Sequence, residues 1–166
     1  MNLIFCVDKN FGIGINNHML FNIKQDLKYF KEKTLNKVIV MGYNTLLSLP
    51  RQEPLKNRIN IVFTSKNVKI ENAIVVHNLS ELLKVLKNYN SNDIFIIGGE
   101  SVYFLLMPYC STAYCTKVDC IKKASVFAPN LDNSSNWEKV CESEIFKEND
   151  LNFEFVEYTN KKPLFF

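Results

Sequence analysis

The sequence predicts an α/β fold in a single domain, with a mostly parallel central sheet, flanking helices and an antiparallel hairpin near the C-terminus. Three observations support this prediction. Short apolar runs lack polar alternation, which is typical of strands that are covered on both faces. Helical patterns separate these runs, as crossovers between parallel strands require. The last third of the chain alternates polar with apolar residues instead, which indicates half-exposed antiparallel strands.

The predicted buried strands are five apolar runs, at residues 3–7, 38–41, 61–63, 74–76 and 94–97. The helical patterns between them cover residues 24–33, a short stretch after Gly42, residues 79–87 and residues 101–107. Ser80 is the predicted N-cap of the third helix, and Pro108 is predicted to end the fourth.

The antiparallel hairpin is predicted from residues 138–146 and 153–158, on either side of a polar, turn-like segment. The polar residues 130–136 predict a surface loop. No internal repeat, low-complexity segment or linker divides the chain, and 166 residues that are 47% apolar suffice for one well-packed core. We therefore expect residues 1–166 to form one domain.

Composition argues against several classes of function. No apolar run approaches the ~20 residues of a membrane span, and the sequence begins without a basic leader, so we expect a cytoplasmic protein without a membrane partner. Five cysteines without a C-x-x-C pair favour a reducing compartment. Cys110, Cys115 and Cys120 have a spacing that suits no metal site, so none is expected. A net charge of +3 gives no reason to expect a nucleic acid partner.

One acidic residue is out of place in the first helical pattern, FNIKQDLKYFK at residues 21–31. Ile23, Asp26, Leu27 and Phe30 share one face of the predicted helix, and that face should meet the core. A carboxylate there is costly unless hydrogen bonds to the charged form compensate for its burial. Two interpretations stay open from the pattern alone: an acid that caps the first turn of the helix, or a functional carboxylate.

Glycines follow two of the predicted strands where helices begin. Gly98-Gly99 follows one strand, and Gly42 follows another just before Asn44 and Thr45. Such junctions let backbone N–H groups approach a phosphate, although ordinary tight turns also use them and the full G-x-G-x-x-G motif is absent. Two of them on one parallel sheet suggest a long ligand with several anionic groups.

Two loops also have functional interpretations. The loop at residues 12–20, GIGINNHML, is either a lid or an irregular surface loop. Both arginines of the chain, Arg51 and Arg58, fall in another short loop. Arginine is the side chain that binds a carboxylate or phosphate through two parallel hydrogen bonds.

Taken in order, these segments resemble the bacterial dihydrofolate reductase family over nearly the whole chain. The most specific matches are the acid followed by L-x-x-F at residues 26–30, the run TLNKVIVMG, and IGGESVY followed by YCTKVD. The resemblance implies a central sheet of about eight strands. It also implies NADPH-dependent reduction of 7,8-dihydrofolate to tetrahydrofolate, by hydride transfer to C6 and protonation of N5. Antifolate-type ligands and a monomeric state are further expectations from the resemblance.

The resemblance also assigns roles around the substrate. It implies that Asp26 accepts hydrogen bonds from the pterin and that Thr116 bonds both this acid and the pterin amino group. Met19 and Phe21 lie where water would enter to deliver the proton. Arg58 matches the arginine that grips the glutamate α-carboxylate, with Arg51 as its neighbour. The apolar walls correspond to Ile4, Phe5, Leu27, Phe30, Leu49 and Ile97.

The implied NADPH site draws on three parts of the chain. Cys6, Ile13 and Gly14 match contacts to the nicotinamide. Gly98-Gly99 resembles the family's cis peptide. The cradle around the rest of the cofactor corresponds to Gly42, Tyr43, Asn44, Thr45, Ser65, Lys66, Ile97, Gly98, Gly99, Glu100, Ser101, Val102 and Tyr103.

The chain departs from the family pattern at three places. Leu20-Phe21 replaces Pro-Trp, which removes an indole N–H beside the acid. Tyr43 replaces an arginine near the cofactor phosphates, and Ser125 replaces an aspartate that steadies the closed lid. Two other interpretations stay open, namely a pyrimidine reductase on the same fold and a folate- or nucleotide-binding protein without turnover.

Overall fold

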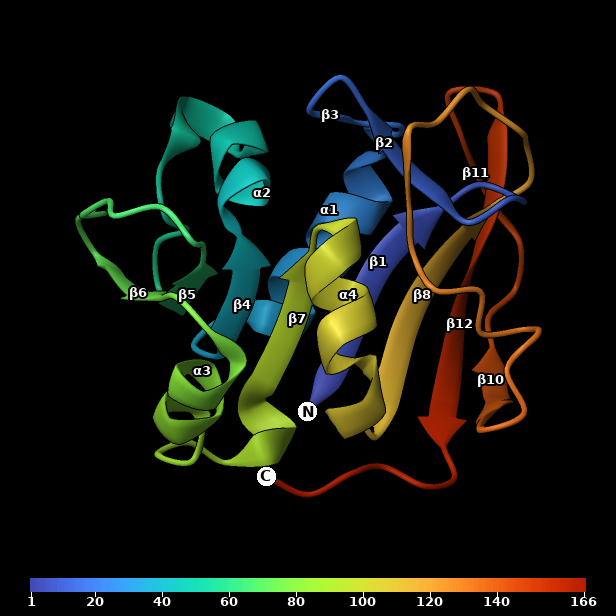
Figure 1. Ribbon diagram of the computed structural model, residues 1–166. Helices are drawn as coiled ribbons and strands as arrows, with labels where there is room; N and C mark the ends of the chain where they lie inside the picture. The colour runs from blue at the N-terminus through green and yellow to red at the C-terminus, as the bar shows by residue number, and fades with distance from the viewer.

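A computed structural model describes residues 1–166, and one large sheet runs through its centre (Figure 1). Its strands follow one another in the order β10, β12, β8, β1, β7, β4, β5 and β6, and β11 pairs with β12 outside this path. The predicted α/β fold with a central sheet of about eight strands is confirmed. The strands of this sheet are β1 (Asn2–Val7), β4 (Val38–Gly42), β5 (Ile59–Phe63), β6 (Ala73–Val76), β7 (Ile94–Gly98), β8 (Thr112–Val118), β10 (Trp137–Glu142), β11 (Phe146–Glu148) and β12 (Leu151–Asn160).

Parallel pairing joins β8, β1, β7, β4, β5 and β6. All five predicted strands form. β1 lies between β8 and β7, and each of its residues except the half-buried Cys6 is buried. We predicted that other parts of the protein cover both faces of each of these strands. This prediction is wrong for β6, which forms the edge of the sheet and leaves Ile74 37% exposed.

The antiparallel part of the sheet surrounds β12, which pairs with β8, β10 and β11. β11 and β12 form the predicted hairpin through Asn149 and Asp150, whose positive φ angles suit a tight two-residue turn. The predicted strand over residues 138–146 is interrupted, because β10 ends at Glu142 and β11 begins only at Phe146. β10 has an irregular register between Lys139 and Cys141 and lies at the other edge of the sheet.

Four α-helices are present: α1 (Lys24–Thr34), α2 (Tyr43–Ser48), α3 (Leu79–Leu86) and α4 (Glu100–Leu106). Short 3-10 turns occupy Pro50–Gln52, Ser91–Asp93 and Met107–Tyr109. The predicted cap of α3 is wrong, because Asn78 rather than Ser80 accepts a hydrogen bond of 2.9 Å from the backbone N–H of Glu81. Pro108 lies in the 3-10 turn that follows α4, one residue beyond the predicted helix end.

The sheet separates two apolar clusters. On one face, Leu82 of α3 and Leu106 of α4 belong to the larger cluster, together with Phe5. On the other face, Leu46 of α2 packs with Ile4, and α1 lies behind the sheet in the view of Figure 1. Ile4 and Phe5 therefore belong to different clusters, because successive strand residues point to opposite faces.

A second, small sheet has the order β3-β2-β9 and consists of β2 (Gly12–Ile15), β3 (His18–Met19) and β9 (Val126–Phe127). Residues 12–20, for which the sequence suggested either a lid or an irregular surface loop, therefore contain a β-hairpin. Asn16 and Asn17 form its turn with φ angles of 50° and 61°, a conformation that asparagine tolerates well. Ser125 N donates a 2.9 Å hydrogen bond to the carbonyl of Gly14, so the hairpin is attached to the segment before β9.

Candidate active site

Asp26 lies in the first turn of α1, half-buried and directed toward two strands of the central sheet. Cys6 of β1 and Thr116 of β8 are direct cross-strand partners. Burial raises the pKa of Asp26 above its ordinary value, while hydrogen bonds to the Thr116 and Cys6 side chains oppose this increase. The structure thus brings Asp26 and Thr116 together, as the resemblance implied, and it also places Cys6 beside Asp26, which was not predicted.

The structure excludes Asp26 as the N-cap of α1, although Asp26 does lie in the first turn of this helix. The N-cap position of α1 is Ile23, which makes no side-chain cap. The carboxylate of Glu148, at the end of β11, instead accepts hydrogen bonds from the backbone N–H groups of Lys24 and Gln25 at 2.7 and 3.1 Å. Because Glu148 satisfies the helix end, Asp26 is not needed as its cap.

The residues that were predicted to form apolar walls around the substrate fall into two groups, according to where the structure places their side chains. Ile4, Ile97, Phe30 and Leu49 pack in the cluster on the α1 face, where Leu55 joins them. Leu55 was missed in the sequence because nothing in its loop distinguishes it from a surface position.

Two other predicted wall residues are placed differently. The ring of Phe5 packs edge-on against Tyr103 in the larger cluster, with the ring centroids 5.4 Å apart, so Phe5 lies apart from the walls on the α1 face. Leu27 was predicted to face the core, but it is 40% exposed. A helix over a cleft leaves one side of its apolar stripe uncovered, whereas a helix over a closed core does not.

Arg58 is held at the far end of α1. Its Nη2 and Nε atoms lie 3.2 and 3.4 Å from the hydroxyl oxygen of Thr34, and Nη1 donates to the carbonyl of Lys56 at 2.8 Å. Partial burial lowers the pKa of Arg58, although a guanidinium stays charged. Arg51, by contrast, is exposed, has a φ angle of 60° and makes no hydrogen bond or ion pair. The structure therefore fixes the orientation of only one of the two predicted arginines.

The two glycine junctions lie against each other. Met41 and Gly98 are register partners, and an added Cβ on Gly42 would lie 3.7 Å from Gly99 N. An added Cβ on Gly99 would lie 3.2 Å from the Thr45 hydroxyl oxygen. The Gly98-Gly99 peptide is cis, as the resemblance implied. Together these residues form a backbone-lined cradle that side chains would fill.

Tyr103 connects this cradle to β1. Its hydroxyl donates a 2.8 Å hydrogen bond to the carbonyl of Ile4, and its ring lies against the space where a Gly98 side chain would be. Val102 is also buried, whereas Asn44 and Ser101 are exposed. The carboxylate of Glu100 accepts a hydrogen bond from Phe127 N, which ties α4 to the small sheet.

The outer end of the cradle is formed by residues after β4 and β5. Lys66 places its ammonium 4.9 Å from the centroid of the Tyr43 ring, and Ser65 beside it is exposed. His77, which the sequence interpretation missed, hydrogen-bonds through Nδ1 to the carbonyl of Thr64 at 2.8 Å. A lone histidine after a strand offers no sequence signal for such a position.

The β2–β3 hairpin contributes the remaining predicted residues. Ile13 and Gly14 lie on β2, and Met19 at the end of β3 is 61% exposed. Phe21 is buried in a small cluster with Leu20 and Ile23. Its ring has no N–H, so it offers no hydrogen bond to a water near Asp26.

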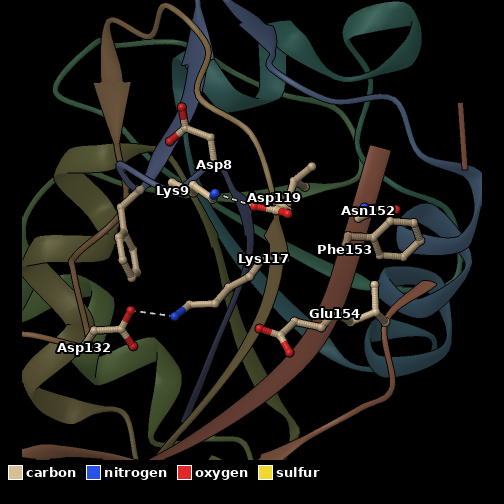
Figure 2. Close-up of a pocket in the computed structure, with 11 residues that line it drawn as sticks. Asp8, Lys9, Lys117, Asp119, Asp132, Asn152, Phe153 and Glu154 are labelled. Atoms are coloured by element: carbon tan, nitrogen blue, oxygen red, sulfur yellow. Dashed lines mark hydrogen bonds and ion pairs between the residues drawn. The ribbon is translucent and has the colours of Figure 1, made fainter. Parts of the chain in front are cut away.

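A hollow of about 340 Å³ lies elsewhere, between the start of the β2–β3 hairpin, β8 and β12 (Figure 2). None of the predicted site residues lines it. Two ion pairs lie along it, Lys9 with Asp119 and Lys117 with Asp132, each at 2.5 Å, and the carboxylate of Asp8 accepts backbone N–H groups. Burial would raise the pKa of Asp132, but hydrogen bonds from Lys117 and Tyr158 outweigh it and lower this pKa.

No group of three or more His, Cys, Asp or Glu side chains is arranged to hold a metal ion. None of the helices combines the length and the apolar character that a membrane crossing requires.

These features define a class of protein: an α/β protein whose parallel sheet carries a half-buried acid beside a threonine, an apolar cluster on the face that α1 covers, and a cradle of glycines at the ends of two strands. The chain belongs to the dihydrofolate reductase family, whose model matches residues 1–160. Dihydrofolate reductase from Bacillus subtilis is 34% identical over 164 residues, which cover 97% of this chain and 95% of that protein. The enzyme of the same name from Buchnera aphidicola of Acyrthosiphon pisum is 34% identical over 82% of this chain and 83% of its own length.

The fold agrees with a solved structure as well. Dihydrofolate reductase from Enterococcus faecalis, complexed with NADP(H) and RAB-propyl, superposes with a TM-score of 0.86 and 28% identity, over 97% of this chain and 96% of that one.

Proposed function

We propose that this protein reduces 7,8-dihydrofolate to 5,6,7,8-tetrahydrofolate with NADPH and so supplies one-carbon metabolism. The observation that carries this proposal is the position of Asp26, which is half-buried beside Thr116 in a fold that also forms a cradle from two glycine junctions. Family membership supports the same reaction.

Asp26 is the group that binds and orients the pterin. Its carboxylate accepts hydrogen bonds from the 2-amino and N3 groups of dihydrofolate, and charged hydrogen bonds offset the cost of its burial. Thr116, already bonded to Asp26, also contacts the pterin amino group. Ile4, Phe30, Leu49 and Ile97 exclude water from the rings.

Arg58 binds the other end of the substrate. Thr34 and the Lys56 carbonyl occupy part of its donor set and hold the guanidinium in one orientation, which leaves its remaining N–H groups for the glutamate α-carboxylate. Arg51 is the exposed neighbour on the same loop and adds positive charge near the tail.

Proton delivery to N5 relies on water and on the charge of Asp26. Met19 is exposed at the end of β3, where water reaches the cleft, and the Asp26 carboxylate favours the protonated pterin electrostatically. Phe21 closes the cleft as an apolar wall and holds no water itself.

The residues present fit NADPH. Side chains would fill the space at Gly98 and Gly99, and the backbone there lies against Gly42 and Thr45. Bound NADPH supplies the hydride that adds to C6 of the pterin. Cys6, Ile13 and Gly14 would contact its nicotinamide, and Thr45 and Ser101 its phosphates. Tyr43, Asn44, Ser65 and Lys66 would hold its outer end, and Ile97, Gly98, Gly99, Glu100, Val102 and Tyr103 would line the rest of the cradle.

The remaining partners follow from the same site. Antifolate-type molecules that carry a pterin-like diamino ring would use the Asp26 hydrogen bonds in place of dihydrofolate. A monomeric state, a single domain over residues 1–166 and a cytoplasmic location stay predictions.

The decisive test is an assay of the purified protein with NADPH and dihydrofolate, following absorbance at the nicotinamide band. Oxidation of NADPH that depends on dihydrofolate is the expected result. Tight dihydrofolate binding without oxidation would indicate a binding protein that lacks turnover. Turnover with a ribosylaminopyrimidine but not with dihydrofolate would identify a pyrimidine reductase instead.

A further inference from the structure

The segment Leu20-Phe21, between the β2–β3 hairpin and the helix that carries Asp26, is held by one side chain from the opposite loop. The ammonium of Lys122 donates a 3.0 Å hydrogen bond to the carbonyl of Leu20 and lies 4.6 Å from the centroid of the Phe21 ring. Leu20 and Phe21 are only 9% and 6% exposed. One cation therefore fixes two consecutive residues through a charged hydrogen bond and a cation–π contact.

The backbone of Lys122 is fixed independently of its side chain. Its N–H donates to Oδ2 of Asp8 at 2.9 Å, while Oδ1 of Asp8 accepts the N–H groups of Asn10 and Gly12 at 2.9 and 2.8 Å. Asp8 thus joins the start of the β2–β3 hairpin to the loop that carries Lys122. The side chain can be altered without removing any of these three bonds.

The other attachments of the hairpin to residues 120–128 are at its beginning and middle. Ser125 N donates to Gly14 O and Ala128 N donates to Phe11 O, both through the backbone. Within residues 120–128, Lys122 has the only side chain that hydrogen-bonds to residues 11–21. It is also the attachment nearest to Asp26 in the sequence.

We propose that Lys122 is a positioning residue for the reductase reaction. It acts through Leu20 and Phe21, which belong to the apolar cluster that packs against Cys6, and Cys6 lies beside Asp26. This inference rests on the proposed function. The Ser125 hydroxyl makes no hydrogen bond in the structure, so it does not hold the Leu20-Phe21 segment. The ammonium of Lys122 holds this segment instead.

Three variants test this role. Lys122→Met removes the charge and keeps a long apolar side chain, and Lys122→Arg keeps a cation that can donate and stack. Lys123→Met is the matched control, because Lys123 is the exposed neighbour and makes no hydrogen bond or ion pair. Each variant is measured for kcat, for KM of dihydrofolate and of NADPH, for thermal midpoint, and for amide hydrogen exchange of residues 12–21.

In Lys122→Met we expect exchange in residues 12–21 to be about tenfold faster, and kcat to fall about tenfold, because small misplacements in a cleft slow a reaction strongly. KM for NADPH and the thermal midpoint should stay near the wild-type values. Lys122→Arg should restore most of kcat, and Lys123→Met should match the wild type.

Wild-type kcat and exchange in Lys122→Met would overturn the proposal, as would failure of Lys122→Arg to restore either quantity. A fall in kcat that merely follows a large fall in thermal midpoint would also overturn it, since that pattern indicates a structural role. These results differ from failure of the proposed function, in which the wild-type protein itself shows no dihydrofolate-dependent oxidation.

Discussion

The ammonium of Lys66 lies over the ring of Tyr43, 4.9 Å from its centroid, at the outer end of the glycine cradle. The family resemblance places an arginine at position 43, so the positive charge in this structure comes instead from the neighbouring strand end. The ring limits the directions that the lysine can take, and a cation with restricted freedom binds an anion at lower entropic cost.

This arrangement predicts that Lys66 supplies the preference for NADPH over NADH. In Lys66→Met, kcat/KM for NADPH should fall about tenfold, the loss expected for one charged hydrogen bond, while kcat/KM for NADH should hardly change. Steady-state kinetics with both cofactors measure the ratio. Lys69→Met, which alters an exposed lysine without a hydrogen bond or ion pair, is the control. An unchanged ratio in Lys66→Met would remove the assignment of this residue.

Asp26→Asn should lose most turnover at neutral pH, by about a hundredfold or more, because the amide neither stabilises a protonated pterin nor orients it as a carboxylate does. Acidification should restore part of the rate, since substrate that is already protonated needs less assistance. The measurement is kcat/KM from pH 5 to pH 8. A wild-type rate at pH 7 would exclude the proposed role.

The same variant should be more stable than the wild type at neutral pH. Burial raises the pKa of Asp26, so folding disfavours its charged form. The contribution of Asp26 to stability is therefore most favourable below its ordinary pKa of about 4, and it is lost as pH rises through the higher pKa of the folded state. Urea unfolding without ligand should show Asp26→Asn gaining over the wild type between pH 4 and pH 7. A difference that stays constant over this range would contradict the pKa direction.

Arg58→Lys should weaken binding of the glutamyl tail by about 1.5–3 kcal/mol, because a point charge cannot replace a forked pair of hydrogen bonds. The value is obtained from KM or Kd for dihydrofolate, with dihydropteroate, which has no glutamate, as the control substrate. Thr34→Val should change binding in the same direction but less, since it removes one of the two groups that hold Arg58 and leaves the guanidinium in place. Equal losses for both substrates would show that Arg58 acts on something other than the tail.

The two cradle glycines should respond differently to alanine. Gly98 has a φ angle of 117° and an added Cβ would lie 3.1 Å from the Tyr103 ring, so Gly98→Ala should cost about 1–3 kcal/mol of unfolding free energy. Gly99 has an ordinary φ angle of −78° and a single tight contact with Thr45, so Gly99→Ala should cost less stability. Denaturant unfolding measures both. Equal costs would refute the argument from backbone conformation.

The buried parallel strands could be predicted because burial on both faces leaves a continuous apolar run, as in Val38–Gly42. The short strands of the small sheet could not be predicted. A two-residue strand such as His18–Met19 has no sequence pattern of its own and forms only because it pairs with β2. The turn at Asn16-Asn17 was not predicted either, although both residues adopt the positive φ angles that asparagine tolerates. The exposure of Leu27 depends on a cleft that helical periodicity does not describe.

The site was predictable wherever its chemistry lies in one segment, as with Asp26 on its apolar stripe and with the glycine junctions. It was not predictable where the partners are remote. Glu148 caps α1 across 124 residues, and Lys122 reaches Leu20 across 102 residues, so no local pattern marks either one. Phe5 shows a further limit of prediction from sequence. Its neighbour Ile4 packs on the α1 face of the sheet, whereas Phe5 packs on the other face, because successive strand residues point to opposite sides.

The place of β12 between β8 and β10 has a consequence for synthesis on the ribosome. A nascent chain that ends before Leu151 carries β8 with one row of backbone groups unpaired, and such an edge invites pairing with other chains. The strand that holds Thr116 is thus protected only when residues 151–160 have emerged. Translation that stalls in the last hairpin should yield aggregation-prone fragments, whereas release of the complete chain should let the edge close.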